Sequence, residues 1–472
     1  MAKVLKSELF ATIPTVDEKK VDAELTAALK KFDHKIIVLD DDPTGVQTVN
    51  GINVYTQWTA ESIADGFAEP NSMFFILTNS RAFSTDKTRA EHQKMAELIA
   101  STAKKFGKKF MVISRSDSTL RGHYPLETEV LRETLEREGH AVDGEVMMPF
   151  FKEGGRFTIG NVHYVQEGDY LVPAGETEFA KDKTFGYTQS DMTKYIEEKT
   201  HGKFKAADVT CISLDELRAV DVDGIAAKLE KVNGFNKVIV NAVDYVDVKV
   251  FALALLKAMS NGKSFMFRTA AAFTKVIGGV PDKALLKKDE LIAHDNKNGG
   301  LIIVGSHVKK TTQQFEALKT LEGLHFIEFD IQTVFKDETL AAEMSRVVGE
   351  AEKLISNGQT VVIYTTRKLL TLPSEEASLQ LSVKISSALT SIVDRLSIKP
   401  SFLIAKGGIT SSDVGTIGLH VKRALVLGQV APGIPVWKIG DESKFPGMSY
   451  IIFPGNVGGV ETLHDIVEML GN

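Results

Sequence analysis

The stretch Lys35-Ile-Ile-Val-Leu-Asp-Asp-Asp-Pro-Thr-Gly45 decides both the fold class and the location of the chemistry. Its apolar run predicts a strand that is buried on both faces of a sheet. Three consecutive carboxylates and a turn-forming Pro-Thr-Gly follow directly. Because ligands of parallel sheets bind beyond the carboxyl ends of the strands, the residues after such runs are the first candidates for function.

Similar short apolar runs alternate with amphipathic helical stretches along most of the chain. This alternation favours right-handed βαβ units and parallel sheets, and so predicts an α/β fold. Strands are expected at 35–39, 73–78, 110–114, 145–149, 237–241, 264–268, 301–305, 360–364 and 402–405. Helices are expected at 17–32, 87–105, 125–138, 311–321, 339–356 and 461–470.

The chain is too long for one typical domain. With 472 residues, two domains of roughly 200 residues each are expected. A polar, turn-rich segment at 278–300 precedes a fresh strand and is the expected boundary. The prediction is a first domain over 1–280 and a second over 281–472, each with a mainly parallel sheet flanked by helices.

Composition argues against several classes of protein. A net charge of -6 and a pI near 6.1 argue against a nucleic-acid-binding protein, whose binding domain is usually basic. The single cysteine, Cys211, excludes internal disulfides, and its strand-like surroundings predict a structural thiol in a reducing compartment. No apolar run approaches the ~20 residues that span a membrane, and the first residues lack the apolar region of a signal peptide. We therefore expect a cytoplasmic protein with no nucleic-acid or membrane partner.

The three carboxylates of Asp40, Asp41 and Asp42 allow two interpretations. Adjacent acidic groups raise one another's pKa values, which can create a general base or a metal ligand. The sequence Asp-Pro-Thr-Gly is equally suited to a plain tight turn. The residues alone do not decide between these interpretations.

A second strand, Phe110-Met-Val-Ile-Ser114, opens onto Arg-Ser-Asp-Ser-Thr-Leu-Arg-Gly at 115–122. The two arginines of this loop and the backbone N–H groups before the helix at 125–138 favour an anion site. A purely structural loop would rarely need such a density of polar groups. The sequence therefore favours a functional role for the loop.

Two further segments follow expected strands in the first half. Arg81 comes after Leu77-Thr-Asn-Ser and can bind a carboxylate through two parallel hydrogen bonds, although a plain surface arginine is as well supported. The segment 149–158 carries two glycines and Arg156, and it fits either a flexible cover or a connecting loop.

Three glycine-containing turns in the second half are suited to phosphates. They are Gly305-Ser306, Gly407-Gly-Ile-Thr410 and Pro454-Gly-Asn-Val-Gly458. Glycine allows the backbone to approach a ligand closely, and adjacent N–H groups can then bind phosphate oxygens. Neither the P-loop signature nor the dinucleotide-binding signature is present. Nucleotide binding is therefore predicted from the three turns together, and the eleven histidines show no metal-binding spacing.

Taken together, these segments resemble the four-carbon acid sugar kinase family over essentially the whole chain. The quoted matches are Asp41-Asp-Pro-Thr-Gly45, Ser80-Arg81, the loop 115–122, Gly155-Arg156 with Thr177 to Asp182, and the three glycine turns. Two positions depart from the family pattern. Arg115 stands where the family commonly has lysine, and Phe453-Pro454 stands where it has Lys-Ser before the last turn.

The resemblance implies ATP-dependent phosphorylation of a terminal hydroxyl of a tetronate-type acid such as threonate, erythronate or 3-oxo-tetronate. Mg²⁺ would accompany ATP, the active site would lie in the interdomain cleft, and a homodimer is among the expected assemblies. The general base is left open between Asp41, Asp42 and Asp117. The implied sugar-acid site consists of Asp41, Arg81, Arg115, Ser116, Asp117, Ser118 and Arg121. The implied ATP site consists of Ser306, Gly407, Gly408, Ile409, Thr410, Gly455 and Gly458, with no metal-ligating residue assigned.

Two rival functions remain. In a haloacid-dehalogenase-like phosphatase, Asp40 of the pattern Asp40-x-Asp42-x-Thr44 would attack phosphate. This rival lacks a convincingly placed later lysine and acidic pair, and it leaves the three glycine turns unexplained. The other rival is a non-catalytic sugar-acid sensor, which would bind the same acids without turnover.

Overall fold

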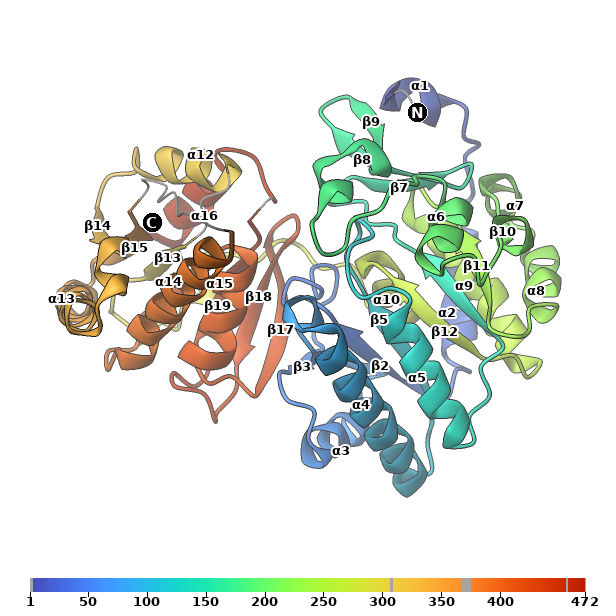
Figure 1. The fold of residues 1–472 in the computed structure, drawn as a ribbon, viewed down its shortest axis with the longest axis horizontal. Coiled ribbons are helices and arrows are strands. Elements are labelled where there is room, and N and C mark those ends of the chain that lie inside the picture. Colours follow the sequence, from blue (N-terminus) through green and yellow to red (C-terminus); the bar gives the residue numbers. More distant parts are fainter. Residues whose placement is uncertain (1–2, 306–308, 367–374, 456, 472) are drawn as a thin grey trace. The chain divides into compact units, whose positions relative to one another are not determined.

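The computed structural model of the chain describes residues 3–305, 309–366, 375–455 and 457–471. These residues form two compact units, shown as a ribbon in Figure 1. The first unit comprises residues 1–45 and 57–281, and the second comprises residues 46–56 and 282–472.

The short segment 46–56 differs from the expected division of the chain, which placed it in the first domain. Its strand β3 (Asn53–Tyr55) pairs antiparallel with β17 (Arg423–Ala431) of the second unit. The side chains of Val54 and Tyr55 are buried there. The strand is too short, and its partner too distant in sequence, for periodicity to reveal this pairing.

The first unit is built on a parallel sheet. Within the described residues, its strands pair in parallel. The strand order is β10 (Thr210–Ile212), β11 (Asn236–Val240), β6 (Gly144–Met148), β12 (Phe265–Thr269), β5 (Lys109–Arg115), β2 (His34–Asp40) and β4 (Met73–Leu77). The register places Asp40 opposite both Arg115 and Leu77, so the polar segments after β2, β4 and β5 begin at one edge.

Helices cover both faces of this sheet, as the alternating sequence pattern predicts. In Figure 1, α4 (Thr85–Phe106) and α5 (Leu126–Arg137) pack together on one face, and α2 (Glu18–Leu29) and α9 (Tyr245–Ser260) pack together on the other. The sequence sets the ends of α4. Ser84 accepts a hydrogen bond from the N–H of Lys87, and Gly107 ends the helix at a φ of 59°. The predicted α/β class is confirmed.

A small antiparallel sheet follows β6, in the order β1 (Val4–Leu5), β9 (Tyr170–Pro173), β8 (Val162–Glu167) and β7 (Arg156–Ile159). The sequence interpretation, a flexible cover or a connecting loop over 149–158, is wrong for Arg156 onward. Gly160 and Asn161, with φ values of 56° and 66°, form the two-residue turn between β7 and β8. Two successive positive φ values match the twist of a hairpin.

The second unit has a parallel core with an antiparallel edge. The parallel strands are β14 (Leu324–Phe329), β15 (Thr360–Thr365), β13 (Leu301–Val304), β16 (Phe402–Lys406) and β19 (Ser449–Phe453). β18 (Ile434–Ile439), β17 and β3 then continue antiparallel. The accompanying helices are α12 (Lys309–Leu318), α13 (Asp337–Ser356), α14 (Glu375–Arg395), α15 (Gly408–Asp413) and α16 (Thr462–Gly471). Ile302, Val362, Ile404 and Ile451 belong to its buried core.

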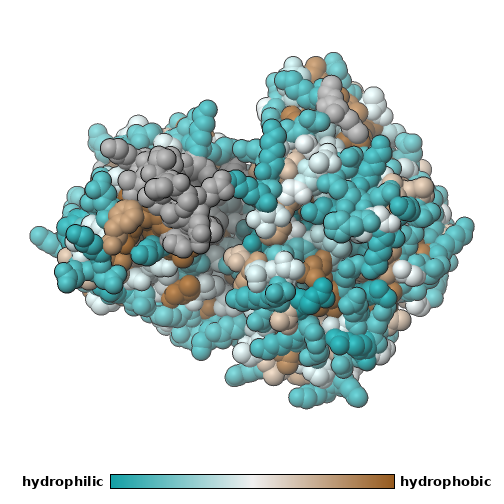
Figure 2. Space-filling model, viewed as in Figure 1, coloured by the Kyte–Doolittle hydropathy of each residue, from teal (hydrophilic) through white to brown (hydrophobic). Residues whose placement is uncertain are grey.

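Two expectations drawn from the composition concern the thiol of Cys211 and the absence of membrane-spanning segments. Cys211 lies half-buried in β10, where burial raises the pKa of its thiol, so it is not an activated nucleophile. Across the described residues, none of the helices combines the length and the apolar character needed to cross a membrane. The face drawn in Figure 2 is mostly hydrophilic, with hydrophobic residues in small patches.

Candidate functional site

The candidate site of the first unit begins where β2 ends in Asp40. This carboxyl group is 1% exposed. Burial raises the pKa of Asp40 to about 8, although the Arg115 guanidinium, 3.2 Å away, opposes the shift. Gly45 closes the turn against this group, because a Cβ atom at position 45 would lie 1.9 Å from an Asp40 carboxylate oxygen. The backbone of the turn therefore packs directly against the Asp40 carboxyl group.

Asp41 occupies the centre of the charged network. One carboxylate oxygen lies 3.3 Å from Nε of Arg81 and also accepts the backbone N–H of Asp117 at 3.2 Å. The other lies 3.5 Å from Nη1 of Arg115. Burial raises the pKa of Asp41 to about 6, and the two arginines limit that rise. Asp41 can therefore exchange a proton near neutral pH.

In contrast to Asp41, Asp42 and Asp117 have lowered pKa values, so both are ionised at neutral pH. Burial alone would raise the pKa of Asp42, but Arg81 and Thr44 together lower it below its ordinary value. Burial is likewise outweighed at Asp117, whose pKa is lowered by Arg121 at 2.7 Å and by Arg81 at 4.0 Å. Both side chains accept hydrogen bonds as carboxylates.

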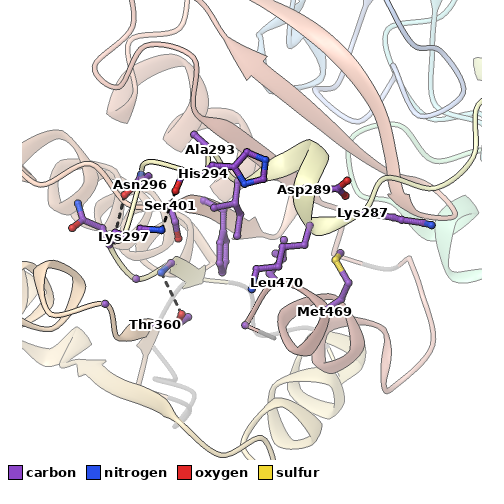
Figure 3. A pocket seen from close by; sticks show the side chains of 18 residues that line it. Lys287, Asp289, Ala293, His294, Asn296, Lys297, Thr360, Ser401, Met469 and Leu470 are labelled. Carbon is purple, nitrogen blue, oxygen red and sulfur yellow. Dashed lines mark hydrogen bonds between the residues drawn. The ribbon is translucent and has the colours of Figure 1, made fainter.

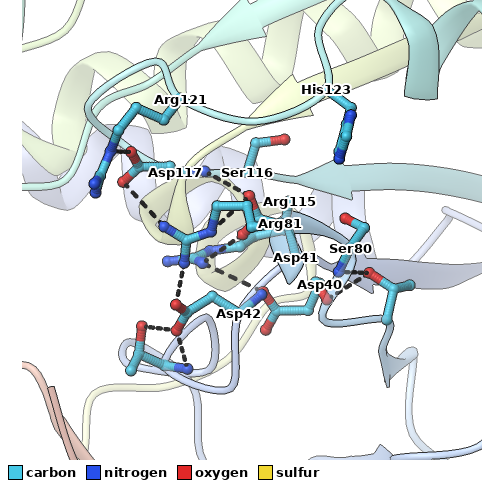
Figure 4. A network of polar contacts seen from close by, with 12 residues as sticks. Asp40, Asp41, Asp42, Ser80, Arg81, Arg115, Ser116, Asp117, Arg121 and His123 are labelled. Atoms are coloured by element: carbon cyan, nitrogen blue, oxygen red, sulfur yellow. Dashed lines mark hydrogen bonds and ion pairs between the residues drawn. The ribbon is translucent and has the colours of Figure 1, made fainter. Parts of the chain in front are cut away.

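Arg81 joins these acidic groups, as Figure 4 shows. It lies in the short 3-10 turn η1 (Ser80–Ala82), which follows a left-handed residue, Asn79, with a φ of 53°. Its guanidinium group contacts the carboxylates of Asp41, Asp42 and Asp117. The loops that follow β2, β4 and β5 therefore meet at one sheet edge and bring together Asp41, Arg81 and Asp117 of the implied sugar-acid site.

The side chains of Ser116 and Ser118 are less accessible than those of Arg81 and Arg121. Ser116 is buried and accepts a hydrogen bond from Arg268 at 2.9 Å. Ser118 is also buried, and its backbone carbonyl oxygen accepts a hydrogen bond from Nε2 of His163 at 2.7 Å. These contacts fix the shape of the loop that carries Asp117.

Two buried residues that the sequence analysis did not single out hold the loops of the site in place through hydrogen bonds and ion pairs. Glu127, at the start of α5, accepts the hydroxyl of Ser80 at 2.6 Å and lies 3.6 Å from Arg268. Arg268, near the end of β12, also donates to the backbone carbonyl of Arg121 at 3.1 Å. Glu127 and Arg268 thus connect the turn carrying Arg81 with the loop carrying Asp117. A charged residue near the end of an otherwise apolar strand was the available signal for Arg268.

In the second unit, two of the glycine-containing turns lie against each other. A Cβ atom on Gly305 would lie 2.6 Å from Oγ1 of Thr410, so the end of β13 approaches the first turn of α15. Gly407 has a φ of 124° and donates its N–H to the carbonyl of Phe453 at 2.9 Å. Ser306 lies outside the described residues, and Gly408 and Ile409 begin α15.

The third turn, which includes Gly455 and Gly458, is held by residues that the sequence analysis did not select, among them Thr311 and Lys406. Thr311 donates its hydroxyl to the carbonyl of Gly455 at 3.2 Å. The buried Lys406 donates from Nζ to the carbonyls of Pro454 and Gly455, the latter at 3.3 Å. Burial, with a smaller contribution from Lys310, lowers the pKa of Lys406 to about 7. An amine that is positively charged when protonated therefore lies beside the turn where Phe453-Pro454 replaces the family's Lys-Ser.

A cavity of about 860 Å³ in the second unit is a competing candidate (Figure 3). It is lined by Gly300, Thr360 and Phe402, at or next to the starts of β13, β15 and β16, and by Leu470 of α16. It therefore lies at the amino ends of the parallel strands. Ligands of such sheets bind at the carboxyl ends, where the glycine turns are.

Among the described residues, one group of acidic and histidine side chains is close enough to hold a metal ion. It consists of His464, Asp465 and Glu468 on α16, of which the two acidic residues are exposed. It includes no residue of the glycine turns.

Both units match known domain families. Residues 36–277 match the sugar-binding N-terminal domain family, and residues 301–463 match the nucleotide-binding C-terminal domain family. No functionally curated protein matches the sequence.

Solved structures share the fold. A protein of Salmonella typhimurium LT2, provisionally described as a tRNA synthase, is 15% identical over 91% of this chain and 98% of its own, with a TM-score of 0.66. Haemophilus influenzae protein HI1011, of the family DUF1537, is 16% identical over 92% of this chain and 100% of its own, with a TM-score of 0.58. At this identity the likeness concerns the fold alone.

The two family matches contain the two candidate sites. The sugar-binding match includes the Asp40–Gly45 turn, Arg81 and the loop 115–122, and the nucleotide-binding match includes the glycine turns. This order of domains is the architecture that the sequence resemblance implied. The chain therefore belongs to the four-carbon acid sugar kinase family, in which a sugar-binding N-terminal domain precedes a nucleotide-binding C-terminal domain.

Proposed function

We propose that the protein is an ATP-dependent kinase that phosphorylates a terminal hydroxyl of a four-carbon sugar acid. The observation that carries this proposal is the network of Asp41, Arg81 and Asp117 at the carboxyl edge of the sheet in the sugar-binding unit. Carboxylates there can accept hydrogen bonds from hydroxyl groups, and arginines can bind a carboxylate. A polyhydroxylated acid presents both kinds of group.

Within this proposal, Asp41 is the general base. A base works best when its pKa lies near the operating pH. The pKa of Asp41 is raised to about 6, whereas those of Asp42 and Asp117 are lowered. Asp41 would take the proton of the attacking hydroxyl, and the other two carboxylates would accept hydrogen bonds from the remaining hydroxyls.

Positioning and charge neutralisation supply most of the acceleration in phosphoryl transfer. Arg81 and Arg121, each partly exposed and already oriented by Asp117, would balance the negative charge of the acid and of the phosphoryl group. Arg115 is almost fully buried and would act on Asp41 rather than on the substrate.

In the second unit, the backbone N–H groups of the turns at Gly407, Gly455 and Gly458 would bind ATP phosphates. Lys406 would hold the last turn in place through its carbonyl contacts. Mg²⁺ would be held mainly by the phosphate oxygens and water, and would neutralise phosphate charge.

The phosphatase alternative is disfavoured by the state of Asp40. A nucleophilic carboxylate must be ionised and reachable, but Asp40 is enclosed by the Gly45 turn and its pKa is raised to about 8. We further propose that the protein acts in the cytoplasm as a small-molecule enzyme. A homodimer is the assembly to test by light scattering.

The direct test is ADP formation by the purified protein with ATP, Mg²⁺ and each of threonate, erythronate and 3-oxo-tetronate. ADP release that depends on one of these acids is the expected result. Phosphate release from sugar phosphates without ATP would support the phosphatase instead. Binding of an acid with no turnover on any member of the set would support the sensor.

A further inference from the structure

One arginine near the candidate site has no acidic partner. Arg156 opens β7, at the start of the small antiparallel sheet. Among the residues that the structure describes, no carboxylate lies within ion-pair distance of Arg156. By contrast, the guanidinium groups of Arg81, Arg115 and Arg121 each contact aspartates at this site.

Arg156 shares an aromatic neighbour with Arg121. The guanidinium carbon of Arg121 lies 5.0 Å from the centre of the Phe179 ring, and that of Arg156 lies 5.7 Å from the same centre. Both distances fall in the range of cation–π contacts. Two positive groups are therefore gathered on one ring, and only Arg121 is neutralised by nearby carboxylates, those of Asp117 at 2.7 Å and Asp182 at 3.9 Å.

The hydrogen-bonding capacity of Arg156 is only partly used. One terminal nitrogen donates to the carbonyl of Gly154. The Nε atom is buried and has no hydrogen-bond partner among the described residues. Burial lowers the pKa of Arg156, Asp117 opposes this shift, and Arg121 adds to it. A buried N–H group normally has a partner, so Arg156 has donor capacity that an anionic ligand can take up.

We propose that Arg156, together with Arg121, forms the subsite that binds the carboxylate of the sugar acid. This inference rests on the proposed function and deepens it by giving the substrate a direction. Asp117 contacts Arg121 and Arg81, and Arg81 contacts Asp41. The acid lies with its carboxylate at the Phe179 end of this series and its terminal hydroxyl at the Asp41 end.

The test is calorimetric binding without ATP. L-threonate and D-erythronate are compared with the neutral polyols threitol and erythritol, on the natural protein and on Arg156→Gln and Arg156→Lys. We expect Arg156→Gln to weaken tetronate binding about tenfold to a hundredfold, the effect of losing a hydrogen bond to a charged group. Arg156→Lys keeps the charge and should recover part of the loss. Binding of the polyols should not change.

Arg132→Gln is the matched control. The Arg132 guanidinium also lies over an aromatic ring, that of Phe235 at 5.0 Å, and its Nε is also buried without a partner. It differs in having a carboxylate neighbour, Glu136, at 2.9 Å, and Phe235 directly precedes β11, at the amino end of a strand. This variant should bind both tetronates like the natural protein.

Three results would overturn the subsite. They are unchanged tetronate affinity in Arg156→Gln, an equal loss of tetronate and polyol binding, and no tetronate binding by the natural protein. If Arg156→Gln has a lowered melting temperature, the comparison rests on Arg156→Lys. Failure of the kinase proposal looks different, because tetronates would then bind in an Arg156-dependent way while ATP is never consumed.

Discussion

The two units present their candidate sites by different means. In the first unit the site is a network of ionised side chains, centred on Asp41 and Arg81, that contact one another across three loops. In the second unit the site is mainly backbone, with glycines at positive φ and a buried lysine holding one turn. The first kind of site depends on which side chains are present, and the second depends on which φ angles the backbone can adopt.

Asp41→Asn should break the first site and leave the second intact. The amide keeps the size of the side chain but cannot accept the proton of the substrate hydroxyl. We expect kcat to fall by about a hundredfold or more, with the KM for ATP unchanged in steady-state assays. Asp42→Asn, in the same turn, is the control and should affect the KM for the acid more than kcat. A raised KM for ATP in Asp41→Asn would contradict the division of roles.

Gly45→Ala tests whether the side-chain network also depends on its backbone. The added Cβ would lie 1.9 Å from an Asp40 oxygen, so the turn must shift. We expect a loss of about 1–3 kcal/mol in the free energy of unfolding, as for other overpacked sites, and a weaker affinity for the acid. Denaturant unfolding and calorimetry measure the two effects. Gly349→Ala, within α13 and with no atom within 4 Å of the new Cβ, should lose neither.

Gly407→Ala should weaken the second site and leave the first intact, the opposite of what is expected for Asp41→Asn. Its φ of 124° is one that residues other than glycine rarely adopt. We expect alanine to introduce strain of about 1–3 kcal/mol in this turn. Because the strained turn binds ATP less well, the KM for ATP should rise by about tenfold. The affinity for the acid, measured without ATP, should stay the same. Equal losses of both ligands would show that the two sites are not independent.

The last expected effect concerns pH. Folding raises the pKa of Asp40 to about 8, so between the unfolded and folded pKa values the folded protein binds the extra proton. Stability from this group is therefore present at low pH and lost as the pH rises towards 8, by at most about 1.4 kcal/mol per pH unit. In melting curves, Asp40→Asn should show a shallower fall between about pH 5 and pH 8 than the natural protein. Parallel curves would refute the buried, proton-binding state of Asp40.

The sequence predicted where most residues of the first candidate site lie in the fold, because its parts are local. β2, β4 and β5 are apolar runs, and parallel strands align their carboxyl ends, so Asp41, Arg81 and Arg115 were expected to meet. Each polar segment follows its strand within a few residues. Their contact also requires β2 to lie between β4 and β5, as it does in the sheet.

The parts that were missed depend on partners distant in sequence. Arg268 supports the loop 115–122 because β12 lies next to β5, an adjacency that periodicity does not reveal. The hairpin of β7 and β8 was missed although Gly160-Asn161 is a turn signal, because Arg156 was assigned to a loop. Lys406 was overlooked because it ends an apolar strand, and its role depends on the pairing of β16 with β19.

The path of residues 46–56 determines how each unit can be produced as a separate protein. The chain passes into the second unit directly after Gly45, contributes β3 there, and returns to the first unit at Gln57. A fragment ending at residue 281 would carry β3 without its partner β17 and expose the otherwise buried Val54 and Tyr55. The complementary fragment would lack the same strand. Two independently folding halves therefore require a permuted or grafted polypeptide, because no single cut in the coding sequence separates the units.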